Sequence, residues 1–419
     1  MIKHNTKKKK QPKRQTSLFP SFQYEELEDV QEGFVSEQLV DLTFRNHVTQ
    51  YLTHGFHSYP AKFIPQLPTW LMQEYSKEGD MILDPFAGSG TTLVEAILNN
   101  RNCVGTEINP IGRLSSEAKS TPVNSLELHR SKDELYRHLG SLMTKHILGH
   151  GIFQDVVKTE VEDLWMPSPE ICNVWFLPEV VTELAIVRHS VEQCKDQKFR
   201  TLALVAFSSI IKSVSNARTE ERNPKLRKEL RSKPDTIKIF KNKLDKMSKD
   251  IIEFSKIVQD KNVQAKIIGD DARKLPLKNN SVNLVITSPP YAYAMDYVRM
   301  HKLSMFWLGI ENPLELDKKF VGTERVYSTS YKSEFTFDIP FVDEYIRRLK
   351  MKSRKKAYIV YKYFMDMQKC FDEMYRVMKK GATAAIVIGN STVQKVEIHT
   401  HLCFDEIAKV IGFDVKPAL

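Results

Sequence analysis

One stretch of the sequence combines a hydroxyl, two prolines and an aromatic ring directly after an apolar run: Ser288, Pro289, Pro290 and Tyr291 follow VNLVIT. Proline lacks a backbone N–H, ends the hydrogen-bond ladder of a strand and holds the residue before it extended. The turn is therefore stiff, and its oxygens point in fixed directions. Such oxygens could accept the hydrogens of a reacting group, although a simple strand-ending turn would have the same sequence.

A second stretch, DPFAGSGTT at residues 84–92, places a glycine-rich turn between an apolar run and a helical pattern. Gly88 and Gly90 allow the backbone to approach a ligand closely and open the N-terminus of the next helix. The stretch has neither the lysine of a phosphate-binding P-loop nor the third glycine of the dinucleotide fingerprint. A tight turn between strand and helix is the structural alternative.

Two acidic positions extend the pattern. Glu107 follows Asp84 by 23 positions, near the spacing of about 20 at which an acidic side chain binds ribose hydroxyls. Asp271 follows another apolar run and could accept a hydrogen bond from an adenine amino group, a role for which Asp270 competes. An exposed loop carboxylate and a helix cap are the alternatives. Together these positions predict an adenosine-containing ligand.

The order DPFAGSGTT and then TSPPY resembles the S-adenosylmethionine-dependent amino-methyltransferases of DNA. The resemblance covers residues 55–110 and 265–310 and, more loosely, 360–415. HSYPAKFIPQLPTWLM, residues 57–72, resembles the segment that closes over the methionine end of the cofactor in that family. Within it, the residues expected to contact the cofactor are Tyr59, Pro60, Ala61 and Lys62. The resemblance implies these cofactor-binding residues: Tyr59, Lys62, Asp84, Phe86, Gly88, Gly90, Thr92, Glu107 and Asp271.

The form Ser-Pro-Pro-Tyr resembles that of the cytosine-N4 enzymes, whereas Asp-Pro-Pro-Tyr is commoner in the adenine-N6 enzymes. It implies that the Ser288 side chain and the Pro289 carbonyl, held rigid with Pro290, accept the two amine hydrogens with little reorganisation. Transfer would be an in-line displacement that depends on alignment. Tyr291 would stack on a base flipped out of the duplex. The sequence contains no Pro-Cys nucleophile of the cytosine-C5 type.

The elements that must position these residues follow an alternation of strands and helices. Residues 81–84, 102–109, 265–268 and 282–287 are expected to be strands, and 91–100 a helix. Ligands bind beyond the carboxyl ends of such parallel strands, where the motifs fall. Towards the C-terminus we expect a helix over 361–381 that ends at Lys379-Lys380-Gly381, a strand over 382–390, a helix over 400–411 and a strand at FDV, 413–415. The predicted class is α/β, a Rossmann-like class I methyltransferase sheet with a large helical insertion.

Four segments are expected along the chain. Residues 1–25 would form a disordered basic tail, 26–112 the cofactor half of the methyltransferase domain, 113–262 a helical insertion, and 263–419 the catalytic half with a second insertion at about 310–358. The helical insertion contains helix patterns over 178–193 and 198–214, and an apolar stripe from Ile237 to Val258 with steps of three and four. We expect the insertion to recognise the target.

The most basic loop of the insertion is SVSNARTEERNPKLRKELRSKP, residues 213–234. We expect Asn216, Arg218, Arg222 and Lys225 to contact DNA from this loop. A solvated charged loop is the alternative. The segment DKKFVGTERVYSTSYKSEF, residues 317–335, is a second candidate for DNA contact.

Composition limits the classes of protein. The net charge is +10, but seven of the positive charges lie in the first fourteen residues, which leaves +3 for the rest. That tail could bind phosphates without specificity. No apolar run reaches the roughly 18 residues that a membrane span needs, and no secretory signal is recognised. The five scattered cysteines include no CxxC pair, so neither a zinc site nor a disulfide framework is indicated, and a cytoplasmic setting is expected.

The expected function is site-specific methylation of cytosine N4 in double-stranded DNA, with S-adenosylmethionine as cofactor and no metal. A cognate restriction endonuclease would be the partner in a prokaryotic or phage-encoded system. The alternatives are an adenine-N6 DNA enzyme, an RNA guanine-N2 methyltransferase and a non-catalytic DNA-binding subunit. The chain stops at FDVKPAL, so the antiparallel strand that usually ends the family sheet is expected to be absent or supplied by a partner.

Overall fold

The computed structural model describes Phe44 and residues 47–149, 163–229, 232–292, 297–327 and 329–417. The chain divides into two compact units, residues 1–47 and residues 48–419. In the first unit, the described part includes Phe44, whose carbonyl accepts a hydrogen bond from the His47 amide at 3.1 Å. The predicted basic tail lies outside the described residues. The second unit contains the elements that follow.

The second unit is built on a five-stranded parallel sheet with the order β3-β2-β1-β4-β5. Its strands are β1 (Met81–Asp84), β2 (Asn102–Thr106), β3 (Ala265–Gly269), β4 (Val282–Thr287) and β5 (Met378–Ile386). In the register, Ile82 of β1 lies between Cys103 of β2 and Leu284 of β4. Because the strands run parallel, Asp84, Thr106 and Thr287 reach the same edge of the sheet. The α/β, Rossmann-like prediction is confirmed.

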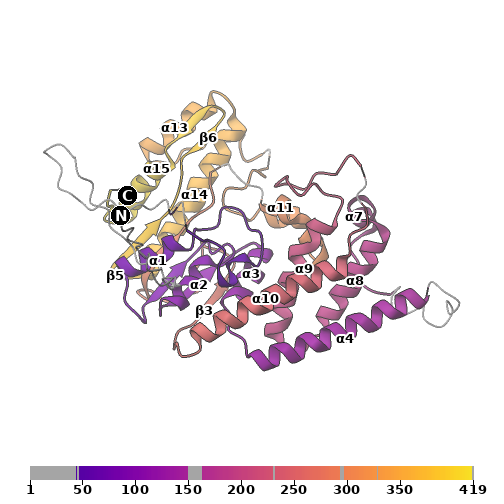
Figure 1. Cartoon of the computed structure of the whole chain (residues 1–419). Helices are drawn as coiled ribbons and strands as arrows, with labels where there is room; N and C mark the ends of the chain where they lie inside the picture. Colours follow the sequence, from indigo (N-terminus) through magenta and orange to yellow (C-terminus); the bar gives the residue numbers. More distant parts are fainter. Residues whose placement is uncertain are drawn as a thin grey trace, which may run out of the picture. The chain divides into compact units, whose positions relative to one another are not determined.

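The helices form two sets along the chain; in Figure 1, α4, α7 and α8 of the first set lie on the right of the view, and α13, α14 and α15 of the second lie at its upper left. One group belongs to residues 48–307: η1 (Leu52–Gly55), α1 (Gln66–Tyr75), α2 (Thr91–Leu98), α3 (Pro110–Ser120), α4 (Ser125–Gly149), α7 (Pro169–Trp175), α8 (Pro178–Glu192), α9 (Gln197–Val214), α10 (Thr236–Val258) and α11 (Tyr297–Trp307). The other follows in the chain: α12 (Pro313–Asp317), which packs against α11, and then α13 (Pro340–Lys350), α14 (Arg354–Val377) and α15 (Thr400–Ile411). Leu83, Val104 and Val285 of the sheet pack in one apolar cluster with α13, α14 and α15.

The helices expected within residues 113–262 are present. Helix α9 packs against α3, α10 and α11, and so connects the helical region to the elements that flank the sheet. The predicted stripe of α10 is buried from Phe240 to Val258, while Ile237 at its start is half-buried. None of the described helices is both long and apolar enough to cross a membrane.

The structure corrects the expectations for the C-terminal third. The stretch 310–358, expected to be irregular, contains α12 and the amphipathic α13, whose Val342, Tyr345, Ile346 and Leu349 are buried with helical spacing. Helix α14 begins at Arg354 instead of residue 361, and β5 begins directly after it at Met378, so Lys379 and Lys380 belong to the strand. The predicted helix over 361–381 was therefore placed too far towards the C-terminus.

Two further differences concern strands. A separate antiparallel hairpin, β6 (Ser391–Val393) and β7 (Val396–Ile398), was not predicted. Its two-residue turn puts Gln394 and Lys395 at φ of 50° and 59°, a conformation usually signalled by Gly or Asn, which this sequence lacks. The strand expected at FDV is absent from residues 413–415, where the Phe413 ring instead packs against the rings of Phe371 and Tyr375.

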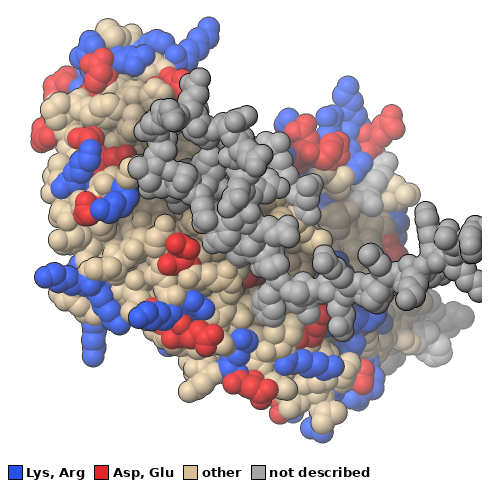
Figure 2. Space-filling view, turned by 60° about the vertical axis from the view of Figure 1, so that its left-hand side comes forward, with Lys and Arg blue, Asp and Glu red and all other residues tan. Residues whose placement is uncertain are grey.

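Basic and acidic side chains are interspersed over the described surface in the view of Figure 2, without a broad area of one sign. This agrees with the near-balance of charge expected for residues outside the first fourteen. On this face, basic side chains gather only in local groups.

Candidate active site

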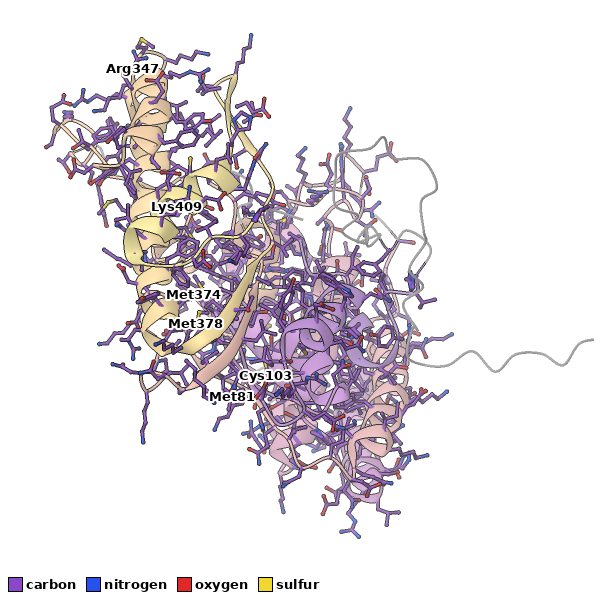
Figure 3. All side chains as sticks on the ribbon, turned by 90° about the vertical axis from the view of Figure 1, so that its left-hand side faces the viewer. Met81, Cys103, Arg347, Met374, Met378 and Lys409 are labelled. Carbon is purple, nitrogen blue, oxygen red and sulfur yellow. The ribbon has the colours of Figure 1, made fainter. Side chains whose placement is uncertain are left out.

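A pocket lies at the carboxyl edge of the sheet, where the segment before β1 and the loops after β1, β2, β3 and β4 meet the segment 319–321. Figure 3 labels Met81, Cys103 and Met378, which lie at the starts of β1, β2 and β5 and so mark the opposite, amino-terminal edge. The pocket is lined by Tyr59, Pro60, Ala61, Lys62, Phe63, Asp84, Pro85, Phe86, Ala87, Gly88, Ser89, Thr91, Thr106, Glu107, Ile108, Asp270, Asp271, Ala272, Arg273, Ser288, Pro290, Tyr297, Lys319, Phe320 and Val321.

Asp84 joins three elements at the base of this pocket. Its Oδ2 accepts a hydrogen bond from Thr92 Oγ1 at 2.6 Å. Its Oδ1 accepts from Thr287 Oγ1 at 2.8 Å and from the Phe86 amide at 3.1 Å. The side chain is buried, and burial raises the pKa of Asp84 to about 6 despite these hydrogen bonds. Asp84 thus fixes the glycine loop, the start of α2 and the end of β4 relative to one another.

The two glycines of the loop have different roles in the structure. Both have positive φ, 53° for Gly88 and 81° for Gly90. Gly88 lines the pocket, and a Cβ there would come within 3.3 Å of the Tyr59 ring. Gly90 does not line it, but a Cβ there would lie 2.8 Å from Ser116 Cα of α3. Gly90 therefore allows α2 and α3 to pack closely, and Thr92, also outside the lining, serves as the partner of Asp84.

Glu107 occupies the position after β2 and lies beneath the glycine loop. Its Oε2 accepts from the Gly88 amide at 2.6 Å and its Oε1 from the Asn109 amide at 2.7 Å. Burial raises the pKa of Glu107 to about 8, although these two amides act in the opposite direction. Each carboxylate oxygen has a second lone pair, so Glu107 can also accept hydroxyl groups from a ligand in the pocket.

Asp271 and Asp270 both line the pocket after β3, so position does not decide between them. Asp271 accepts from Arg273 through Nε at 2.8 Å and Nη2 at 3.0 Å. Burial alone would raise the pKa of Asp271, but the Arg273 guanidinium outweighs burial and lowers it. Arg273 also pairs with Asp366 of α14 at 3.2 Å and donates to the Lys319 carbonyl at 2.9 Å. It thereby holds the pocket wall that contains Phe320.

The segment from Tyr59 to Lys62 covers the pocket from the other side, as expected for a closing segment. The Tyr59 ring stacks on His301 at a centroid distance of 5.2 Å and on Tyr297 at 6.1 Å. Lys62 Nζ donates to the His54 carbonyl at 3.1 Å.

The closing segment is attached to α2 by a single buried carboxylate. Glu95 of α2 accepts from the Tyr51 hydroxyl at 2.7 Å and from Thr69 Oγ1 at 2.6 Å, and it contacts His54 Nε2 at 2.7 Å. Residues before and after Tyr59–Lys62 are therefore fixed to the helix that follows the glycine loop.

Of the predicted catalytic turn, Ser288 and Pro290 line the pocket. The turn is anchored at Thr287, whose hydroxyl donates to Asp84 and whose carbonyl accepts from the Val387 amide at 2.9 Å. Pro289 is buried behind the lining. Tyr291 is half-buried outside the lining, and its ring lies beside Gly389, where a Cβ would be 3.3 Å from Cε1.

The four residues expected to contact DNA lie outside the pocket, in a small hairpin that follows α9. Ala217 and Leu226 form an antiparallel bridge, and the Arg218 amide donates to the Lys225 carbonyl at 2.8 Å. Arg222 and Lys225 are exposed and Arg218 is half-buried.

Asn216 departs from the expectation of surface contact. It is 6% exposed, and its amide donates to the Trp175 carbonyl of α7 at 2.7 Å. Asn216 therefore holds the base of the hairpin in place. The candidates for contact with DNA are the exposed Arg222 and Lys225 at its tip.

Several lining residues were not predicted from the sequence. Ile108 directly follows Glu107, and its place after a strand end was a usable signal. Arg273 was not predicted although it pairs with Asp271 two positions away, and its contacts with Lys319 and Asp366 are remote in the chain, as is the position of Phe320. Lys119 and Ser89 were not predicted either, because the burial of a lysine beneath a loop depends on the packed fold.

Comparison with known proteins finds similarity to DNA methyltransferases. A family model described as DNA methylase matches residues 1–111. The chain is 27% identical to the Type II methyltransferase M.MvaI of Kocuria varians, over 88% of this chain and 83% of that protein. It is 22% identical to the Type II methyltransferase M.MjaII of Methanocaldococcus jannaschii, over 70% of this chain and 69% of that protein. It is 25% identical to the Type II methyltransferase M.BsoBI of Geobacillus stearothermophilus, over 86% and 78% of the two chains.

Proposed function

We propose that this chain, which belongs to the S-adenosylmethionine-dependent DNA amino-methyltransferases, methylates the exocyclic N4 amine of a cytosine in double-stranded DNA. The observation that carries the proposal is that Ser288 and Pro290 line the same pocket as Gly88 and Glu107. A turn with rigid acceptors and a site suited to an adenosine-containing ligand therefore share one continuous space.

The residues of the pocket fit S-adenosylmethionine, which supplies an electrophilic methyl group on a sulfonium. Glu107 is placed to accept the ribose hydroxyls, and Asp270 or Asp271 to accept the adenine amino group. Apolar surface for the adenine ring comes from Ile108 and Phe320, which belong to one packed cluster. Among the described residues of the lining, Thr91 has a buried hydroxyl without a hydrogen-bond partner.

The chemistry expected of the chain is to position and polarise an amine. The lone pair of the cytosine amine is delocalised into the ring, so an acceptor for each of its hydrogens favours the sp³ form that attacks. Ser288 Oγ and the Pro289 carbonyl are the proposed acceptors. The hydrogen bonds of Thr287 to Asp84 and Val387 hold this turn in place before substrate arrives, which lowers the cost of reorganisation.

Substrate access requires a base outside the duplex, because base pairing hides the amine. We assign Tyr291 as the ring that stacks on the flipped base. Gly389 approaches the Tyr291 ring so closely that a Cβ there would lie 3.3 Å from Cε1. The hairpin with Arg222 and Lys225 is the proposed phosphate-binding element of the helical insertion. The likeness to Type II methyltransferases supports a role as the modification enzyme beside a cognate restriction endonuclease.

Transfer of a labelled methyl group tests the substrate class. The full chain is incubated with labelled S-adenosylmethionine and, in parallel, with unmodified double-stranded DNA, the same DNA as single strands, and transfer RNA. We expect label in double-stranded DNA that resists ribonuclease. Label in RNA alone would reject the proposal in favour of the guanine-N2 alternative. Binding of the cofactor without transfer to any of the three would favour a non-catalytic subunit.

A further inference from the structure

Helix α3 contains a lysine that lies wholly inside the protein beneath the glycine loop. Lys119 is 0% exposed. Its Nζ donates a hydrogen bond to Ser89 Oγ at 3.0 Å. Among the described residues, Ser89 is the one hydrogen-bond partner of this ammonium group, and no carboxylate pairs with it. An ammonium has three donors, so two are left without an acceptor.

A buried ammonium in such surroundings is costly. Lysine is almost never fully buried unless it is paired, because transfer of a charge out of water is expensive. Burial is the main cause that lowers the pKa of Lys119. The positive charges of Lys62 and Lys243 lower it further. The nearby titratable groups His54 and His57 are buried too, and burial lowers the pKa of each. An anion bound close to Lys119 would therefore be stabilised by it.

The geometry shows where an anion could lie. Ser89 and Lys62 both line the pocket, as does Thr91. A serine hydroxyl has one hydrogen to donate, and Ser89 already accepts from Lys119, so its own hydrogen is available to the pocket. Within the part of the chain that the structure describes, Thr91 Oγ1 is buried without a partner. Three residues with donor groups, Ser89, Lys62 and Thr91, thus line the pocket, and Ser89 and Thr91 lie at the N-terminus of α2, an end of a helix that favours negative charge.

We propose that Lys119, acting through Ser89 and together with Lys62, is the counter-charge for the carboxylate of the amino-acid half of the methyl donor. Lys119 is a positioning residue. It orients the Ser89 hydroxyl towards the pocket, and its positive charge stabilises the carboxylate without contacting it directly. The inference rests on the proposed function, since it names which part of the cofactor this end of the pocket binds.

Two ligands that differ in that carboxylate test the proposal. S-adenosylhomocysteine contains the amino-acid group, whereas 5′-methylthioadenosine has the same adenosine and thioether without it. Both are titrated calorimetrically into the full chain and into Lys119→Met, which keeps the length of the side chain and removes the charge. We expect about 10- to 100-fold weaker binding of S-adenosylhomocysteine by the variant, the range for a hydrogen bond to a charged group, and unchanged binding of 5′-methylthioadenosine.

Two further variants separate this role from a structural one. Ser89→Ala removes the intervening hydroxyl and should reproduce the selective loss. Lys261→Met is the matched control, because Lys261 donates to Asn100 Oδ1 and the Leu98 carbonyl at the other end of α2, and it should leave both affinities unchanged. The ligand-free melting temperature of Lys119→Met should not fall, since a buried unpaired charge is removed.

Each possible result points to a different conclusion. Equal losses for both ligands in Lys119→Met, or no loss for either, would overturn the role of Lys119 while the proposed function stands. A wild-type chain that binds neither ligand would overturn the proposed function and this inference with it.

Discussion

Ser288 is the residue on which the proposed chemistry depends, and it is not the residue that anchors the turn. Its neighbour Thr287 makes the anchoring hydrogen bonds, to Asp84 at 2.8 Å and from Val387 at 2.9 Å. Ser288 itself lines the pocket and is half-buried. A change at Ser288 therefore removes an acceptor for the substrate without loosening the turn.

For Ser288→Ala we expect turnover to fall by about 100-fold or more, comparable to the loss of one fixed hydrogen-bond partner of a transition state. The dissociation constant for S-adenosylhomocysteine and the melting temperature should stay at wild-type values. Single-turnover transfer to DNA and calorimetry measure the two quantities. A variant with wild-type turnover would show that Ser288 is not an acceptor in the reaction.

His301 gives a second prediction at this scale. Burial lowers the pKa of His301 to about 4, whereas an unfolded histidine has a pKa of about 6.5. The unfolded chain thus binds more protons, so the stabilisation from neutral His301 is complete above about pH 6.5 and declines as the pH falls towards 4. The raised pKa values of Glu107 and Asp84 change the stability with pH in the opposite direction. The contribution of His301 must therefore be isolated by comparison with a variant.

We therefore predict that the difference in unfolding free energy between wild type and His301→Gln narrows on acidification. The expected change is about 1.4 kcal/mol per pH unit below about pH 6.5. Chemical denaturation of both proteins at several pH values between about 7.5 and 5 measures this change. The contributions of Asp84 and Glu107 are present in both proteins and cancel in the difference. A constant difference over this range would mean that the pKa of His301 is the same in the folded and unfolded chains.

At the scale of elements, the hairpin after α9 is the part of the helical insertion that presents basic side chains without burying them. Arg222 and Lys225 are exposed, while Lys225 pairs with Glu221 at 3.1 Å. An exposed pair of this kind contributes little to stability. The base of the hairpin is held by Asn216 and Trp175, so the tip can be changed without unfolding it.

Replacing both Arg222 and Lys225 by Ala should weaken DNA binding and lower the slope of log K against log salt by about 1.8, or about 0.9 for each phosphate that is no longer neutralised. Cofactor affinity should not change. The control is a pair of changes at Lys379 and Lys380, exposed residues at the amino-terminal start of β5, away from the pocket. An unchanged salt slope in the hairpin variant would place the phosphate contacts elsewhere.

The elements also show how far sequence reasoning reaches. The strands that end at Asp84, Thr106 and Thr287 could be predicted because apolar runs followed by turn residues are local signals. The contact of Arg273 with Lys319 and Asp366 could not, because it depends on how distant segments fold back. The hairpin turn at Gln394 and Lys395 was missed since its residues are unusual for that conformation.

At the scale of the whole molecule, the site joins the parts of residues 48–419 that are far apart in sequence. The closing segment, the glycine loop, the ends of β2 and β3, the Ser-Pro-Pro-Tyr turn and the segment 319–321 all line one pocket. Residue types and spacing indicated the glycine loop, the strand ends and the turn, whereas the closing segment was expected from the family resemblance and the segment 319–321 was not expected to line the pocket. Lys119 remained hidden because burial of a lysine under a loop is a property of the packed fold.

Identification of the methylated base is the decisive experiment for the proposed reaction. The full chain is incubated with S-adenosylmethionine and unmodified genomic DNA, the DNA is digested to nucleosides, and the products are identified by mass spectrometry, with Ser288→Ala as the matched control. We predict N4-methylcytosine from the wild type and a strongly reduced amount from the variant. N6-methyladenine as the product would contradict the assignment of cytosine, and equal N4-methylcytosine from both proteins would contradict the assigned role of the Ser-Pro-Pro-Tyr turn.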